Sequence, residues 1–167
     1  MAEKLITGGD APVINALLTG KFLYTVDLDA DKLINMAKEK RAQKYFPIDE
    51  IMPENRIISR LIELNNLVED AKDAIDDSIK FRLIFSQVIT DIYHNLYEFN
   101  GIWRESIKNT LQVFEKELPN IYPMFLTMLD DGEKPMVRVD NAEKIVNILA
   151  EKYGGIPSKY IITNINK

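Results

Sequence analysis

The stretch from Glu54 to Phe99, which contains no proline and no glycine, constrains the fold more than any other feature of this sequence. A continuous helix over that stretch would be about 70 Å long at 1.5 Å per residue, which is more than a compact domain of this size accommodates. Asp76, Asp77 and Ser78 interrupt the apolar pattern near its middle, and all three are good helix N-cap residues. We therefore expect either one kinked helix or two long helices with a short break at this point.

Apolar residues recur at helical spacing on both sides of the interruption. The first row is Ile57, Leu61, Leu64, Val68, Ala71 and Ile75, and the second row is Phe81, Phe85, Val88, Ile92, Leu96 and Phe99. Rows of this kind form the buried seam of a helix that packs lengthwise against partner helices. The sequence thus predicts a helical bundle whose core lies in residues 53–129, with a short helix over residues 121–129.

Other helices are predicted from their start signals and their apolar spacing. Asp10 caps a predicted helix over residues 11–19, and a second predicted helix covers about residues 30–44. The apolar row that begins at Trp103 predicts a third helix, which ends before Pro119.

Three short runs have the pattern of β-strands. Residues 21–28 alternate in polarity, "MVRV" at 136–139 is a short β-branched run, and "SKYIITNI" begins at residue 158. We predict an α+β fold that is predominantly helical, with a strand–helix–strand element over about 136–166 that strand 21–28 could join. One domain is expected over residues 1–167, because no linker or repeat divides the chain.

Composition excludes several classes of protein. The chain has 46% hydrophobic and 28% charged residues, as in an ordinary globular domain, and the absence of cysteine excludes disulfides, thiolate catalysis, zinc knuckles and iron–sulfur clusters. A net charge of -5 argues against unspecific attraction to nucleic acid or an anionic membrane. No signal peptide or membrane-spanning run is expected, so a cytoplasmic location is predicted.

The single histidine, His94, lies between two acids at helical spacing, Asp91 and Glu98, which raises the question of a metal site. On a helical wheel these three residues point about 130° away from the seam around Ile92. Metal sites in bundles use inward-facing ligands from several helices. We therefore predict a solvated face with no metal and no cofactor.

A second acidic group could support enzymatic chemistry. Glu69, Asp70, Asp73 and Asp77 lie opposite the first seam, and paired carboxylates on helices can bind Mg²⁺ and position a phosphorylated substrate. The sequence shows no second inward acidic pair to complete such a site. A metal-dependent helical phosphohydrolase is the enzymatic alternative.

A basic patch is predicted at the end of the helix over residues 30–44. Its members are Lys38, Lys40, Arg41 and Lys44. Cations at this end suit the helix dipole, and a solvated face is the ordinary interpretation of such a cluster. Its functional interpretation is a nucleic-acid-associated regulator, for which this patch is the only support.

Aromatic and methionine side chains outnumber the core positions that the seams provide. The predicted interaction surface consists of Tyr93, Tyr97, Tyr122, Met124, Phe125 and Met128. A short helix with "IYPMFLTML" cannot bury all of its apolar residues alone, and Tyr and Met are common at binding surfaces. A well-filled core is the alternative interpretation of the same residues.

The sequence favours a non-enzymatic interaction or assembly protein, a subunit of a homo- or hetero-oligomeric complex or particle. Its single histidine and the lack of a nucleophile motif argue against catalysis. The abundance of Ile, Asn and Lys suggests a viral or phage component, located in the host cytoplasm or in the particle. The predicted partner is another protein or a second copy of this chain.

Overall fold

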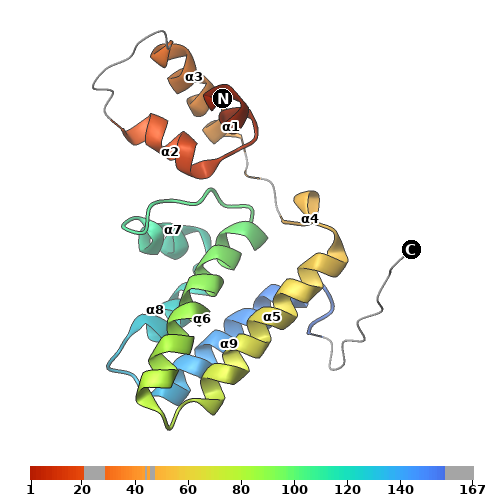
Figure 1. The fold of residues 1–167 in the computed structure, drawn as a ribbon, viewed down its shortest axis with the longest axis vertical. Helices are drawn as coiled ribbons and strands as arrows, with labels where there is room; N and C mark the ends of the chain where they lie inside the picture. Colours follow the sequence, from red (N-terminus) through yellow and green to blue (C-terminus); the bar gives the residue numbers. More distant parts are fainter. Residues whose placement is uncertain (21–28, 44, 46–47, 157–167) are drawn as a thin grey trace. The chain divides into compact units, whose positions relative to one another are not determined.

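The computed structural model of the protein describes residues 1–20, 29–43, 45 and 48–156. Within these residues every regular element is an α-helix (Figure 1). The helices are α1 (Ala2–Thr7), α2 (Ala11–Thr19), α3 (Ala30–Ala42), α4 (Ile48–Ile51), α5 (Glu54–Asp73), α6 (Ser78–Phe99), α7 (Thr110–Glu117), α8 (Tyr122–Leu129) and α9 (Pro135–Glu151). In this part of the chain, no helix combines the length and the apolar character that crossing a bilayer requires.

The predicted α+β fold with a C-terminal strand–helix–strand element is wrong, although its predominantly helical character is confirmed. Residues 136–139, expected as a strand, lie in the first turn of α9, which begins at Pro135. Periodicity cannot distinguish a strand from a helix in so short an apolar run. The other two predicted strands, at residues 21–28 and from residue 158 onward, lie outside the described residues.

Tertiary packing explains why α9 starts early. Val139 opens a buried row at helical spacing that continues along the helix through Ala142, Ile145, Val146 and Leu149. Proline is well suited to the first position of a helix, because its missing N–H has no partner there in any case. The helix therefore includes the whole "MVRV" segment.

Aspartate caps begin α2 and α3, and the cap of α2 is the one that the sequence predicted. Asp10 Oδ1 accepts a hydrogen bond of 3.0 Å from Val13 N at the start of α2. Asp29 Oδ1 accepts one of 2.9 Å from Lys32 N at the start of α3. Such a cap satisfies one of the backbone donors that the first helical turn leaves unpaired.

The break between α5 and α6 lies where the sequence predicts it. Helix α5 ends at Asp73 and α6 begins at Ser78, where Asp77 Oδ1 accepts hydrogen bonds of 3.1 Å from Ile79 N and Lys80 N. Both predicted seams are buried throughout, except that Ile75 is half-buried. The predicted seams and the predicted break are confirmed, and of the two alternatives left open by the sequence the structure has two separate helices.

The chain divides into two compact units, which are considered one at a time. The first unit comprises Met1–Ile51 and Leu96–Tyr122, and the second comprises Met52–Asn95 and Pro123–Lys167. The single domain predicted over residues 1–167 stays a prediction.

In the first unit, α1, α2 and α3 pack on one another around a small apolar core. The buried members of this core are Ile6, Ile14, Leu33, Ala37 and Trp103. Trp103 comes from a segment far along the chain, which lacks helical structure before α7 begins at Thr110. The helix predicted from Trp103 onward is therefore shorter than expected.

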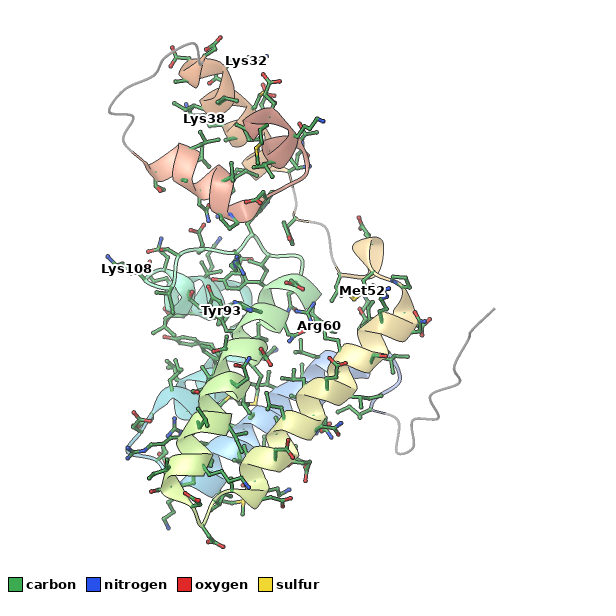
Figure 2. The ribbon with its side chains drawn as sticks, in the orientation of Figure 1. Lys32, Lys38, Met52, Arg60, Tyr93 and Lys108 are labelled. Atoms are coloured by element: carbon green, nitrogen blue, oxygen red, sulfur yellow. The ribbon has the colours of Figure 1, made fainter. Side chains whose placement is uncertain are left out.

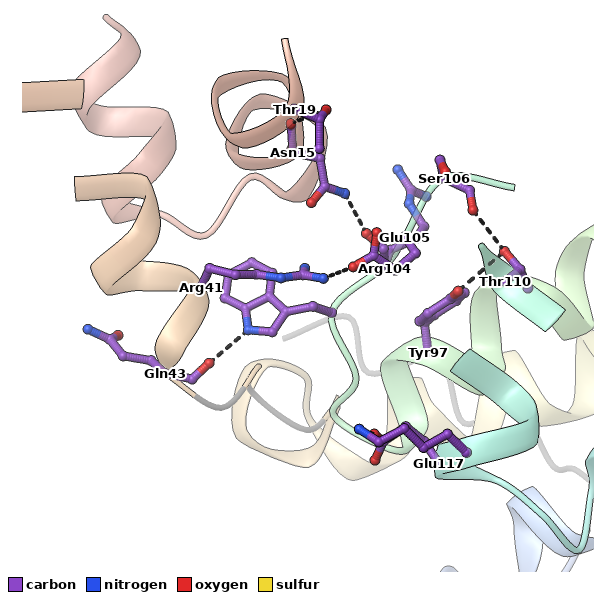
Figure 3. A network of polar contacts seen from close by, with 12 residues as sticks. Asn15, Thr19, Arg41, Gln43, Tyr97, Arg104, Glu105, Ser106, Thr110 and Glu117 are labelled. Carbon is purple, nitrogen blue, oxygen red and sulfur yellow. Dashed lines mark hydrogen bonds and ion pairs between the residues drawn. The ribbon is translucent and has the colours of Figure 1, made fainter. Parts of the chain in front are cut away.

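Polar contacts attach this segment to α2 and α3 (Figure 3). Trp103 Nε1 donates a hydrogen bond of 2.7 Å to Gln43 O, and the Arg41 guanidinium lies 5.5 Å from the centre of the Trp103 ring system while it forms an ion pair with Glu105. Asn15 Nδ2 donates a 2.8 Å hydrogen bond to the backbone oxygen of Arg104. These contacts fix the segment between helices α6 and α7 against the N-terminal helices.

In the second unit, α5 packs along α9, and Arg138 of α9 contacts two further helices and the turn before α9. Arg138 is only 8% exposed. Its Nε donates a 2.9 Å hydrogen bond to Met128 O of α8, its Nη1 lies 2.8 Å from Asp131 Oδ1, and its guanidinium lies 4.9 Å from the centre of the Phe85 ring on α6. A buried charge is tolerated when it is paired and hydrogen-bonded in this way.

Candidate functional site

A hollow of about 420 Å³ lies between α5 and α6 in the second unit. Its lining residues are Arg60, Glu63, Leu64, Leu67, Gln87, Asp91, His94 and Asn95. Figure 2 labels Arg60, which marks the position of the hollow along α5. Both helices contribute polar side chains to the lining, and α5 also contributes Leu64 and Leu67.

The hollow has a buried floor and a solvent-exposed rim. Leu64 and Asn95 are each 3% exposed, so they form the floor. Asp91 and His94 are half-buried, whereas Glu63 and Gln87 are exposed. This gradient from a buried amide to exposed carboxamide and carboxylate groups is suited to binding a polar molecule.

Hydrogen bonds hold the α6 wall in place but leave one acceptor without a donor. Gln87 Nε2 donates a 2.8 Å hydrogen bond to Asp91 Oδ1, and Asn95 Nδ2 donates one of 2.7 Å to the backbone oxygen of Asp91. Asn95 Oδ1 is buried and accepts no hydrogen bond from the described residues. A buried acceptor in that state costs about 1–3 kcal/mol, so it favours a ligand that can donate to it.

Asp91, His94 and Glu98 were considered as metal ligands and predicted to form a solvated face of one helix. Asp91 and His94 do not lie on a fully solvated face, since both are half-buried on the wall of the hollow, and the His94 ring lies 5.1 Å from that of Tyr93. Glu98 belongs to the first unit and does not line the hollow. Among the described residues, no three histidines or acids converge closely enough to hold a metal ion.

The second acidic group does not gather into a site either. Glu69, Asp70 and Asp73 are exposed on α5, and Asp77 is exposed at the start of α6. Lys72 lies among them, 3.8 Å from Glu69 Oε1 and 3.7 Å from Glu143 Oε2 of α9. Lys72 thus neutralises part of the acidic face and links it to α9.

The members of the predicted basic patch differ in exposure and in their contacts. Lys38 is exposed and Lys40 is half-buried, whereas Lys44 lies outside the described residues. Arg41 is engaged by Glu105 and Trp103, and its partial burial lowers the pKa of its guanidinium. Arginine nevertheless stays charged at neutral pH, so Arg41 acts here as a structural ion-pair partner rather than a free cation.

The predicted interaction residues also separate into two groups. Tyr97, Phe125 and Met128 are buried, so these side chains contribute to the core rather than to a surface. In the first unit Tyr97 lies 4.9 Å from the Phe114 ring and donates a 3.3 Å hydrogen bond to Thr110 Oγ1 (Figure 3). Tyr93, Tyr122 and Met124 are half-buried, and their role in an interaction stays a prediction.

Sequence reasoning missed the exposed apolar side chains that two helices of the second unit carry. Ile79 and Leu83 of α6 are 81% and 73% exposed, and Leu126 and Leu129 are exposed on α8. Each pair has helical spacing, four or three residues apart, but is out of register with the buried row of its own helix. That second apolar register is visible in the sequence and could have indicated them.

The residues that form the hollow were less accessible to sequence reasoning. Arg60 and Glu63 read as ordinary polar positions of α5, and Asn95 stands one residue before a seam leucine. Only the packing of α5 beside α6 brings these residues to the same hollow as His94.

Comparison with models of protein families, with curated proteins and with solved structures gives no match.

Proposed function

We propose that this protein works by contact with other protein chains, as a non-enzymatic subunit of an assembly. The observation that carries the proposal is the exposure of Ile79 and Leu83, which lie one turn apart on α6. Their neighbours on the opposite face, Phe81 and Phe85, fill the core with stacked rings 5.0 Å apart. Helix α6 therefore presents apolar side chains on two faces, and one of them has no cover in the described residues.

Ile79 and Leu83 expose apolar surface at neighbouring positions of α6, and covering that surface would be favourable. A single exposed leucine is common on protein surfaces, but adjacent large apolar side chains at this exposure leave a continuous patch in contact with water. Covering each of these two side chains would contribute on the order of 1.5–3 kcal/mol. Leu126 and Leu129 of α8 are also exposed, so they add to the apolar surface that the second unit leaves in contact with water.

A comparison of variants in the analytical ultracentrifuge tests the proposal. Wild-type protein should associate with itself in a concentration-dependent manner, and the double variant Ile79→Glu with Leu83→Glu should be monomeric. Each truncated anchor at the centre of an interface costs about 2 kcal/mol, or roughly thirtyfold in the dissociation constant. Ile107→Glu is the matched control, because Ile107 is 80% exposed but belongs to the first unit.

Two results would contradict the proposal. One is a wild-type protein that stays monomeric throughout the concentration range. The other is an equal loss of association in the control Ile107→Glu, which would mean that any added negative charge disrupts the oligomer.

A further inference from the structure

The second unit has another hollow, of about 500 Å³, between α6 and the start of α9. Helix α6 contributes three large apolar residues to its lining, of which Phe81 and Phe85 are buried and Ile89 is half-buried. Pro135, in the first turn of α9, adds apolar contact from the opposite side. We refer to this recess as the α6–α9 hollow, and it offers apolar contact to a side chain that enters it.

The exposed pair Ile79 and Leu83 projects from α6 directly beside the α6–α9 hollow. Residues three positions apart on a helix are neighbours on its surface. Ile79 is therefore the neighbour of Arg82, and Leu83 is the neighbour of Ser86, and both of these neighbours line the hollow. The same surface of the second unit thus carries an apolar projection next to a recess with apolar walls.

The charged groups that line the α6–α9 hollow balance, with two arginines against two acids. Arg138 and Asp131 pair with each other at 2.8 Å. Arg82 and Glu133 are both exposed, and neither side chain has an ion pair or a hydrogen bond within the described residues. The two charges that lack a partner are therefore one cation and one anion, at the same recess.

We propose that a second copy of this chain covers the α6–α9 hollow in a two-fold symmetric dimer, an inference that rests on the proposed function. Ile79 and Leu83 of each copy enter the hollow of the other, and Arg82 of each copy pairs with the partner's Glu133. A two-fold interface uses the same surface on both subunits, so every contact in it occurs twice. A projection beside a recess, with unpaired charges of both signs, is self-complementary in this sense.

Partners of other chemistry complement this surface less well. A strongly acidic or strongly basic chain gains little from a recess whose four charged groups sum to zero. Ile79 and Leu83 require an apolar surface to cover them, while the hollow requires an apolar side chain to fill it. A second copy supplies both at once.

Charge reversal in single variants and in their mixture tests this arrangement by analytical ultracentrifugation. Arg82→Glu places two acids opposite each other, and Glu133→Arg places two cations opposite each other. Each variant alone should dimerise at least about tenfold more weakly than wild type, because like charges then meet twice in each dimer. An equimolar mixture of the two variants should form a heterodimer with an affinity close to that of wild type, since both of its pairs again join opposite charges.

Two further variants complete the test. The double variant Arg82→Glu with Glu133→Arg should dimerise with itself, because the exchange restores opposite charges at both pairs. Arg56→Glu is the matched control, since it is the same substitution at an exposed position of α5 outside the hollow. It should change the affinity by less than about twofold, as expected for a distant screened charge. Circular dichroism melting curves verify that each variant is folded.

The proposed dimer is overturned if Arg82→Glu and Glu133→Arg associate as wild type does, or if their mixture stays monomeric. It is equally overturned if Arg56→Glu weakens association as much as Arg82→Glu, because the effect would then be one of overall charge. The proposed function survives each of these results as long as Ile79→Glu with Leu83→Glu still abolishes association. A wild-type protein that stays monomeric would contradict both.

Discussion

The second unit is built on long apolar rows that run along α5 and α6, whereas the first unit joins short helices to a distant segment through polar contacts. In the first unit the hydrogen bond from Trp103 to Gln43 spans 60 positions of sequence, and the one from Asn15 to Arg104 spans 89. The seams of the second unit repeat every three or four residues. The difference shows that local periodicity accounts for one unit, while the other depends on contacts between segments far apart in the chain.

The two units should therefore respond differently to substitution. A buried seam position is surrounded by other apolar residues, so a charge introduced there has no partner. The small core of the first unit has few members, and Trp103 is the one that also makes polar contacts with Arg41 and Gln43. Damage at Trp103 should thus remove apolar and polar contacts together.

The largest effect is expected from charges in the seams of the second unit. Leu64→Asp and Phe85→Asp should each unfold this unit, because an unpaired buried carboxylate costs several kcal/mol while a whole domain is stable by about 5–15 kcal/mol. Thermal unfolding followed by circular dichroism measures the loss. Ile107→Asp is the control and should leave the melting temperature nearly unchanged, since Ile107 is 80% exposed and lies outside the surface proposed for association.

The fluorescence emission of Trp103 tests whether the two units lose their structure separately. Trp103 is the single tryptophan, and it belongs to the first unit. If the emission of Leu64→Asp stays native-like while its helical signal falls, the damage is confined to the second unit. A wild-type melting temperature in both seam variants would show that the seams are not the core.

A smaller effect is expected from Trp103→Ala, at about 3–5 kcal/mol for a large aromatic side chain removed from a core. Trp103→Phe keeps part of the ring contact with Tyr45, whose ring centre lies 4.8 Å away, but loses the N–H group that donates to Gln43. It should cost less than the alanine variant. Hydrogen exchange of the amides in α1, α2 and α3 measures both losses. Equal losses in the two variants would mean that the aromatic ring contributes nothing to this core.

The smallest effect is expected from the ion pairs of the first unit. Glu105→Gln should cost about 1 kcal/mol, because Arg41 would lose a charged partner in a partly buried position. Glu3→Gln removes the partner of Lys32, a pair 2.7 Å apart whose side chains are both more than half exposed, and should have no measurable effect. Urea denaturation of both variants beside wild type measures the difference. A loss in Glu3→Gln as large as in Glu105→Gln would contradict the role assigned to burial.

Much of the helical framework could be predicted from local signals. The seams, the break at Asp76 to Ser78 and the caps at Asp10 and Asp29 all depend on residues within one or two turns of each other. The prediction of a strand at 136–139 was wrong, because the polarity pattern of four residues is too short to distinguish a strand from a helix. The packing of α9 against α5 supplied the information that was missing.

The candidate site could not be predicted in the same way. The sequence directed attention to Asp91, His94 and Glu98 because they share one face of a single helix. The hollow instead combines Asp91 and His94 with Glu63 and Arg60, whose distance in sequence exceeds any helical repeat. Wheel geometry describes one helix in isolation, so it cannot show what a neighbouring helix adds.

The sequence by itself determined where α5 gives way to α6 and which faces of these two helices are buried. These features follow from side-chain polarity and capping, which act over a few residues. Tertiary structure alone decided that Trp103 joins the core of the first unit, that Arg41 pairs with Glu105, and that α5 and α6 enclose a polar hollow. Those contacts join segments far apart in the chain. They stabilise the fold only after packing has brought the segments together, so local sequence patterns cannot reveal them.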